Sequence, residues 1–237
     1  MKLKDYILYD RPLNNLGGGK LFISTLNAHS YNVSRKDFNF SEALSNSDVL
    51  IPDGISVVWA LKFLTGKELK KIAGADLFFY EMNRLQQKGG ACFFLGSTEE
   101  TLQKIKERAA KEYPNVKIDT YSPPYKTEFS TEDSQKMIDA INKVKQDVLF
   151  IGLTAPKQEK WGYEHFSKLS AEHICCIGAV FDFYAGTVKR APEWMINIGL
   201  EWFYRLIKEP KRMWKRYLLG NTKFVWYVFL EKFSKKG

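Results

Sequence analysis

The chain has 237 residues, of which 45% are hydrophobic, and it carries a formal net charge of +9. This length is enough for one α/β domain with a small appendage, and the hydrophobic content excludes an intrinsically disordered chain. The excess of positive charge favours an anionic partner: phosphate groups, nucleic acid or an acidic membrane surface.

The three cysteines, Cys92, Cys175 and Cys176, lie in apolar stretches. An odd number without ligand spacing argues against a disulfide framework or a zinc site, so we expect buried thiols in a reducing cytoplasm. Residues 1–13 contain no apolar signal-peptide core, and no apolar run approaches the roughly 18 residues of a spanning helix. We therefore expect a protein that touches a membrane without crossing it.

Short, almost wholly apolar segments alternate with helical patterns along the first 192 residues. Strands are predicted at 20–24, 48–51, 91–95, 116–121, 147–153 and 173–180. Helices are predicted at 55–65, 75–88, 99–111, 131–145 and 157–170. Apolar strands separated by helices are typical of a sheet buried on both faces. We predict an α/β fold: a Rossmann-like, mostly parallel sheet with helices on both faces.

The composition changes after about Pro192. Residues 201–237 contain ten Lys and Arg against three Glu, together with ten aromatic residues, and show no strand pattern. We predict a catalytic domain at 1–192 and a helical, basic C-terminal appendage at 193–237. Basic, aromatic and amphipathic sequence favours an anionic membrane surface as the partner. A solvated helix over packed aromatics and a nucleic-acid contact are the alternatives, and we expect no nucleic acid.

Three polar residues follow the first two strands at the edge where α/β sheets bind ligands. Thr25 and Asn27 come after the first strand, and Asp53 precedes Gly54 after the second. A carboxylate at this place serves as a general base, and the hydroxyl and amide line a pocket. Ordinary helix capping and turn chemistry explain the same residues equally well.

Further candidates follow the later strands. Gly96 and Gly152 end strands where a nucleotide can approach the backbone, and Gln158 lies in the first turn of the next helix. Asp182 is flanked by aromatic residues and can receive a base edge or a sugar hydroxyl, or pair with an arginine. Asp76 is better explained by its place in a first helical turn. The chain has neither a GxGxxG fingerprint nor a P-loop, which weighs against a nicotinamide- or methyl-donor-dependent enzyme.

Arginines recur in the appendage at a spacing of seven and four. Arg205, Arg212 and Arg216 share one helical face if Pro210 begins a new segment. Arginine suits bidentate recognition of phosphate better than lysine does. We therefore expect a phosphate site on this face.

Taken together, the motifs resemble the WecG/TagA/CpsF family of bacterial glycosyltransferases over essentially the whole chain. The longest matching stretches are GAVFDFYAGTVKRAPEW at 178–194 and GLEWFYRLIKEPKRMWKRY at 199–217. The shorter PDG at 52–54, GADL at 74–77 and APKQE at 155–159 fall in the family's order. One such motif is weak evidence, whereas five in register are specific.

The resemblance implies a cytoplasmic enzyme that is peripheral on the inner face of the membrane. Members transfer a sugar from a UDP-sugar to a polyprenyl-diphosphate-linked sugar with inversion, and the best-known donors carry N-acetylmannosamine or its uronic acid. Their products are teichoic acid, capsule and other cell-surface polysaccharides. A non-catalytic membrane-surface or nucleic-acid-binding module that uses only the basic segment is the alternative, and the possibility of a homo-oligomer stays open.

The resemblance also assigns roles to residues. Asp53 matches the catalytic base, with Thr25 and Asn27 beside it. The donor side is expected at Gly96, Gly152, Gln158 and Asp182, and the acceptor diphosphate or membrane at Lys71, Arg205, Arg212 and Arg216. Lys71 stands where the family often has Arg, and Thr154 where a Gly is common. Since no DxD motif is present, we expect Lys and Arg to stabilise the leaving diphosphate, with no metal and no cofactor.

Overall fold

A parallel sheet forms the centre of the computed structural model, which describes residues 1–234. Its six strands are all parallel and run in the order β4-β3-β8-β7-β5-β6. They are β3 Leu21–Leu26, β4 Val49–Pro52, β5 Ala91–Gly96, β6 Lys117–Tyr121, β7 Val148–Gly152 and β8 His173–Cys176. A separate antiparallel pair, β1 Lys2–Leu3 and β2 Tyr6–Ile7, lies near the N-terminus.

Alternate side chains of each strand enter opposite layers of the core. In β5, Cys92 and Phe94 pack on one face, whereas Phe93 and Leu95 pack on the other. All four are buried, as a strand in the middle of a two-sided sheet requires. This burial is why the strands read as unbroken apolar segments in the sequence.

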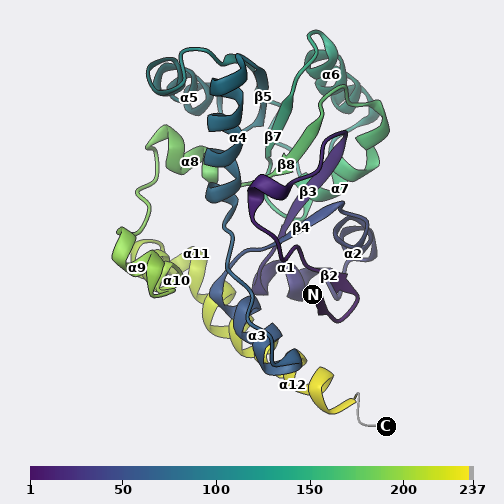
Figure 1. Ribbon diagram of the computed structural model, residues 1–237, viewed down its shortest axis with the longest axis vertical. Coiled ribbons are helices and arrows are strands. Elements are labelled where there is room, and N and C mark those ends of the chain that lie inside the picture. Colours follow the sequence, from purple (N-terminus) through teal and green to yellow (C-terminus); the bar gives the residue numbers. More distant parts are fainter. Residues whose placement is uncertain (235–237) are drawn as a thin grey trace.

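Helices cover both faces of the sheet (Figure 1). On one face lie α4 Gly74–Lys88, α5 Glu99–Glu112 and α8 Val180–Ala185, and on the other lie α6 Thr131–Asn142 and α7 Lys157–Glu164. Thr98 and Ser130 cap α5 and α6 with their side chains. The predicted α/β fold with a parallel sheet is confirmed.

A third cluster joins the end of the chain to the sheet. It contains residues of α1 Ala28–Ser34, α2 Phe38–Ser45, α3 Ile55–Thr65 and α12 Gly220–Ser234. Phe224 and Val228 of α12 are buried in it, and the Tyr31 and Phe224 ring centroids are 5.2 Å apart at right angles. The last helix is therefore packed onto the sheet domain and runs beside α3 (Figure 1).

The remaining C-terminal helices lead from α8 to α12. They are α9 Glu193–Asn197, α10 Glu201–Lys208, α11 Pro210–Trp214 and a π-helical turn, η3, at Lys215–Leu219. Pro210 begins a new helical segment, α11. The predicted appendage is helical up to residue 234, and residues 235–237 lie outside the described residues. The domain boundary at 192 stays a prediction.

Some boundaries differ from the sequence-based expectation. The predicted strand 173–180 ends at Cys176, because Gly178 takes a φ of +53° and Val180 begins α8. The predicted helix 131–145 ends at Asn142, and 157–170 divides into α7 and the 3₁₀ turn η2, Phe166–Lys168. Helices α1 and α2, and the 3₁₀ turn η1 Leu13–Asn15, were not predicted.

Two further expectations concern thiols and membranes. All three cysteines are free and buried, as predicted, and burial raises the pKa of each thiol. Within residues 1–234, no helix combines the length and the apolar character that a membrane span needs.

Candidate active site

Three adjoining cavities open at the carboxyl ends of β3, β4, β7 and β8. We call them the α3 cavity, of about 310 Å³, the strand-end cavity, of about 630 Å³, and the inner chamber, of about 170 Å³. His29, Arg205 and Arg216 line all three. The cavities therefore form one site, placed where open α/β sheets bind their ligands.

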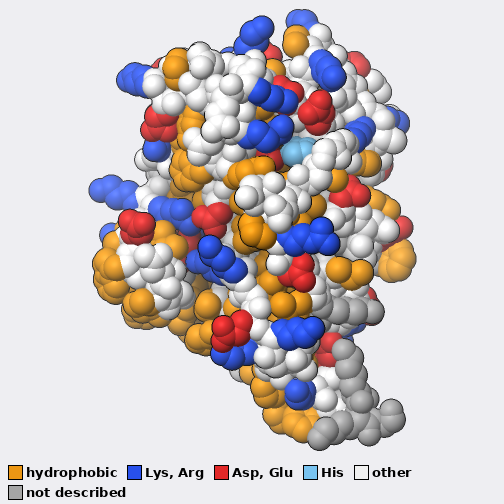
Figure 2. All heavy atoms as spheres, viewed as in Figure 1, with side chains coloured by type: hydrophobic (Ala, Val, Ile, Leu, Met, Phe, Trp, Pro, Cys, Tyr) orange, Lys and Arg blue, Asp and Glu red, His pale blue; other side chains and the backbone are white. Residues whose placement is uncertain are grey.

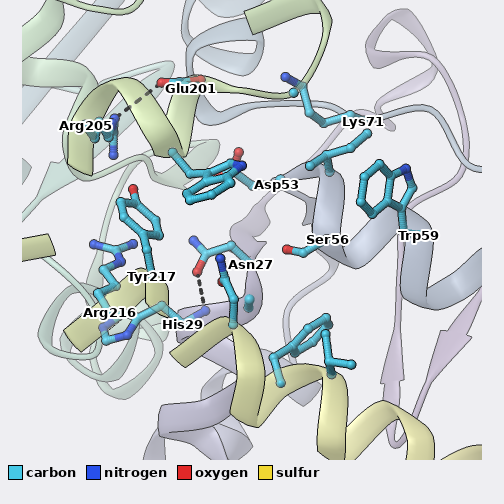
Figure 3. Close-up of a pocket in the computed structure, with 18 residues that line it drawn as sticks. Asn27, His29, Asp53, Ser56, Trp59, Lys71, Glu201, Arg205, Arg216 and Tyr217 are labelled. Carbon is cyan, nitrogen blue, oxygen red and sulfur yellow. Dashed lines mark hydrogen bonds and ion pairs between the residues drawn. The ribbon is translucent and has the colours of Figure 1, made fainter. Parts of the chain in front are cut away.

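Asp53 lies between the α3 cavity and the inner chamber. It directly follows β4, and its backbone N–H donates to the Leu26 carbonyl at 2.9 Å. Gly54 then takes a φ of +108°, which turns the chain into α3. Figure 3 shows Asp53 facing Asn27 of the β3 end and Glu201 and Arg205 of α10.

The environment of Asp53 raises its pKa to about 6. Burial is the largest cause, and the nearby Glu201 carboxylate adds to it. The positive charges of Arg205, Lys71 and Arg216 act in the opposite direction. A carboxylate with this pKa accepts a proton near neutral pH, as a general base must.

The predicted arginines come together from α10, α11 and η3. Arg205, Arg212 and Arg216 all line the strand-end cavity, each from a different helical segment. That this group binds phosphate stays a prediction. Arg205 forms a 3.5 Å ion pair with Glu201 and lies 4.6 Å from the centroid of the Phe183 ring. Arg212 is exposed and pairs with Glu209 at 2.6 Å.

Arg216 and Lys71 are held differently. Arg216 is half-buried, and its Nε has no hydrogen-bond partner within residues 1–234. Burial lowers the pKa of its guanidinium, because removing the positive charge from water disfavours the charged form. A bound anion would offset this cost. Lys71 lines only the α3 cavity, where its Nζ donates to the Ile196 carbonyl at 3.5 Å.

Glycines shape the strand-end cavity. Gly152 lines it, and a Cβ at this position would lie 2.7 Å from the Phe181 ring. Gly96 lies behind Gly152, and a Cβ there would meet the Gly152 carbonyl at 2.5 Å. Gly96 lines none of the three cavities, whereas its neighbour Ser97 lines the strand-end cavity. Close packing of the two strands requires a glycine at position 96, and the donor contact expected there stays a prediction.

Asp182 also lines the strand-end cavity, from α8. Burial raises the pKa of its carboxyl group, and the positive charge of Arg212 opposes the shift. The side chain is half-buried, so it stays available to a polar group that enters the cavity.

The inner chamber is lined by Thr25, Gln158 and the unpredicted Glu159. Thr25 is buried and caps no helix, whereas Asn27 does cap α1, accepting from the His29 and Ser30 N–H groups at 3.0 Å. The capping explanation therefore holds for Asn27, which also lines the site. Gln158 is 3% exposed, which excludes the alternative of a solvated first-turn glutamine.

Sequence reasoning missed several lining residues: His29, Trp59, Glu159, Glu201 and Tyr217. Burial, aided by the charge of Arg216, lowers the pKa of His29 to about 4, so the imidazole is neutral at pH 7. The four-residue spacing between Glu201 and Arg205 is the one signal that points to their pairing. Nothing in the sequence marks His29, because the short helix α1 brings it into the site.

Metal-binding geometry is not found in the described part of the chain. Residues 1–234 hold no group of three or more His, Cys, Asp or Glu side chains placed to bind a metal. The expectation that the reaction needs no metal stays a prediction.

Comparison with known proteins gives this site its context. A sequence model of the glycosyl transferase WecG/TagA/CpsF family matches residues 10–237. The chain belongs to this family. It is therefore a glycosyltransferase, and both the family and the enzyme class expected from the sequence are confirmed.

Two bacterial relatives carry the same name, N-acetylglucosaminyldiphosphoundecaprenol N-acetyl-beta-D-mannosaminyltransferase. The Bacillus subtilis (strain 168) protein is 34% identical over 214 residues, which cover 90% of this chain and 81% of the relative. The Bacillus spizizenii (strain ATCC 23059 / NRRL B-14472 / W23) protein is 33% identical over 205 residues, covering 86% of this chain and 77% of the relative.

Proposed function

We propose that this glycosyltransferase moves an N-acetylmannosaminyl group from its UDP-linked donor to an N-acetylglucosamine carried on a polyprenyl diphosphate, with inversion. The observation that carries the proposal is Asp53, a carboxylate with a pKa of about 6 in a cavity lined by lysine and arginine. The names of the two Bacillus relatives supply the sugars and the lipid. The product then enters a cell-surface polysaccharide.

The cavities divide the two substrates. We place the UDP moiety in the larger strand-end cavity, beside Gly152 and Asp182, with its diphosphate against Arg212. We place the acceptor in the α3 cavity, which contains Lys71 and the aromatic Trp59. Arg205 and Arg216 line both cavities and lie between the two diphosphates. Arg212 thereby takes a donor role in place of the acceptor role that the family resemblance implies.

The reaction follows from this arrangement. Asp53 takes the proton of an acceptor hydroxyl while that oxygen bonds to the anomeric carbon of the donor sugar. The bond from this carbon to the UDP oxygen breaks on the opposite face. The departing diphosphate gains negative charge, which Arg205 and Arg216 stabilise from fixed positions. These cations take the place of a metal, so turnover is expected to persist in a chelator such as EDTA.

Exposed apolar side chains lie beside the α3 cavity and form the face that we propose to contact the membrane. Trp59 and Phe63 of α3 and Trp226 and Phe229 of α12 are each 48% exposed or more. Lys232 of α12 donates to the Phe63 carbonyl at 2.8 Å, which joins the two helices. Figure 2 shows hydrophobic side chains over α9 and α10 and near the end of α12. We propose that this face rests on the anionic inner leaflet of the cytoplasmic membrane.

Vesicle flotation tests the membrane contact. The protein should float with phosphatidylglycerol vesicles, and a variant carrying W226A and F229A should not. V144A is the matched control, because Val144 is 52% exposed on the sheet domain. Equal flotation of all three proteins would contradict the membrane proposal.

Sugar transfer is tested directly by mass spectrometry. The enzyme is incubated with UDP-N-acetylmannosamine and a short-chain polyprenyl-diphosphate N-acetylglucosamine. A product heavier by one N-acetylhexosamine, absent with D53N, supports the proposal. Absence of any product from wild-type enzyme that binds both substrates would overturn it.

A further inference from the structure

The inner chamber gathers buried polar atoms that have no partner. Gln158 Oε1, Glu159 Oε2 and Arg216 Nε accept or donate no hydrogen bond within residues 1–234, and all three side chains line this chamber. A buried polar atom without a partner costs about 1–3 kcal/mol, so such atoms are rare in folded proteins. Their concentration around one small chamber indicates a place where the polar groups of a ligand bind.

Gln158 and Glu159 are fixed against each other in the first turn of α7. Gln158 Nε2 donates to Glu159 Oε1 at 2.9 Å, and the two side chains are 3% and 1% exposed. This bond leaves one oxygen of each side chain unpaired. A Cβ at Gly178 would lie 3.5 Å from Gln158 Oε1, so the glycine keeps the space beside that oxygen open.

The surroundings of Glu159 favour its neutral form. Burial raises the pKa of Glu159 to about 7, and the hydrogen bonds from Gln158 and from its own backbone oppose the shift. The Cys176 thiol of β8 lies close enough for the Glu159 charge to raise the pKa of that thiol. Other titratable or charged groups also line the chamber, from α1, the turn after β4, the segment before α9, α10 and η3. They are His29, Asp53, Arg190, Glu201, Arg205 and Arg216.

The position of the chamber indicates which part of a substrate enters it. Asp53 lines the inner chamber as well as the α3 cavity, where we place the acceptor. A group in the chamber therefore lies next to the proposed base. The chamber is much smaller than the strand-end cavity, at about 170 Å³ against about 630 Å³. The proposed function places the nucleotide in the larger cavity. The hydroxyl and acetamido groups of a sugar ring can form hydrogen bonds with the three unpaired atoms that line the chamber.

We propose that Glu159 is a specificity-determining residue of the donor-sugar subsite, donating a hydrogen bond from Oε2, as a neutral carboxylic acid, to an oxygen of the sugar. Gln158 Oε1 accepts a hydrogen bond from a sugar hydroxyl. This assignment rests on the proposed function, because it takes the donor to be a UDP-N-acetylhexosamine.

Calorimetric titration with UDP and with UDP-N-acetylmannosamine tests the assignment. In E159A, the Kd of the UDP-sugar should rise about tenfold while the Kd of UDP stays unchanged, since UDP lacks the group that Glu159 contacts. E164Q is the matched control, because Glu164 lies exposed on the same helix. An unchanged ratio of the two Kd values in E159A would overturn the proposal.

The isosteric variant E159Q keeps a hydrogen-bond donor but cannot titrate, and it removes the risk that E159A fails to fold. In wild type, the affinity for the UDP-sugar should fall as the pH rises through 7, because Glu159 loses the proton it donates. In E159Q this fall should disappear between pH 6.5 and 8.5, while the affinity at pH 6.5 stays within about threefold of wild type. An undiminished pH dependence in E159Q would contradict the proposal.

The two proposals fail in different ways. Absence of sugar transfer by the wild-type enzyme would overturn the proposed function. Wild-type transfer combined with an unchanged ratio of Kd values in E159A would overturn only the role of Glu159.

Discussion

The Glu201 carboxylate of α10 raises the pKa of Asp53, although Asp53 follows β4 and Glu201 belongs to the C-terminal helices. Glu201 also pairs with Arg205, whose positive charge lowers the pKa of Asp53. The C-terminal helices thus set the protonation of the proposed base as well as closing its cavity. The active site is complete only when α10 is packed against the ends of the strands.

The pH dependence of turnover should report this pair. Asp53 acts as a base only when ionised, so kcat/KM should fall as the pH drops through about 6, the pKa of Asp53. E201Q removes the negative charge that raises the pKa of Asp53 and frees Arg205 from its ion pair. The acidic limb of the kcat/KM profile should therefore move to lower pH. The profile is measured from pH 4.5 to 8 with K211A, an exposed charge variant, as the control. A limb that stays in place or moves upward would contradict the role of Glu201.

Removing the Asp53 charge should abolish transfer and increase stability. The folded-state pKa of about 6 lies above the ordinary 3.8, so the folded protein loses stability as the pH rises from 3.8 to 6. Above pH 6 the wild type keeps a half-buried, ionised carboxylate that Asp53→Asn does not have. We expect D53N to gain about 2 kcal/mol in free energy of unfolding at pH 7.5, a value reduced from the full shift for partial exposure, and little at pH 4.

Urea unfolding at the two pH values measures this gain, and sugar transfer measures the loss. D53N should transfer sugar at least about 100-fold more slowly than wild type while binding UDP with similar affinity. Equal free energies of unfolding for the two proteins at pH 7.5 would show that the ionised Asp53 carboxylate does not destabilise the folded state.

The arginines should contribute unequally to UDP binding. Arg216 is half-buried with an unpaired Nε, so R216A removes a preorganised phosphate donor and should weaken UDP binding by tenfold or more. Arg212 is exposed and already paired with Glu209, so R212A should cost about threefold or less. K211A is the control, and fluorescence or calorimetric titration gives the Kd values. A larger loss in R212A than in R216A would show that the exposed Arg212, and not the half-buried Arg216, supplies most of the binding energy for the UDP diphosphate.

The sequence predicts the sheet well for a physical reason. Strands such as β7, whose residues Val148–Ile151 are buried on both faces, must be apolar throughout, and apolar runs are easy to detect. Helices α1 and α2 escape detection because their seven and eight residues give too few turns for a clear period. Their buried faces pack against α12, α3 and the N-terminal segment, which sequence alone does not bring together.

The site is predicted in part for a similar reason. Thr25 lies near the end of β3, and Asn27 and Asp53 directly follow β3 and β4, so the carboxyl-end rule places all three at the inner chamber. Glu201 and His29 enter the site through the packing of α10 and α1, which leaves no local pattern. Gly96 shows that a strand-end glycine can have a second reason in the fold, because the close approach of β5 and β7 requires it.

Thr154 offers a prediction that joins sequence and backbone geometry. The residue has a φ of +66°, in the left-handed region that disfavours a β-branched side chain, and it lines the strand-end cavity and the inner chamber. Thr154→Gly removes the clash of Cβ with the backbone at the cost of some chain entropy. We expect a net gain of about 1 kcal/mol, which raises the Tm by roughly 2–4 °C for a protein of this size. Differential scanning calorimetry measures it, with T127G as the control, since the exposed Thr127 has no positive φ and should gain nothing. A Tm lowered by T154G would show that the threonine side chain stabilises this turn through contacts that outweigh its backbone strain.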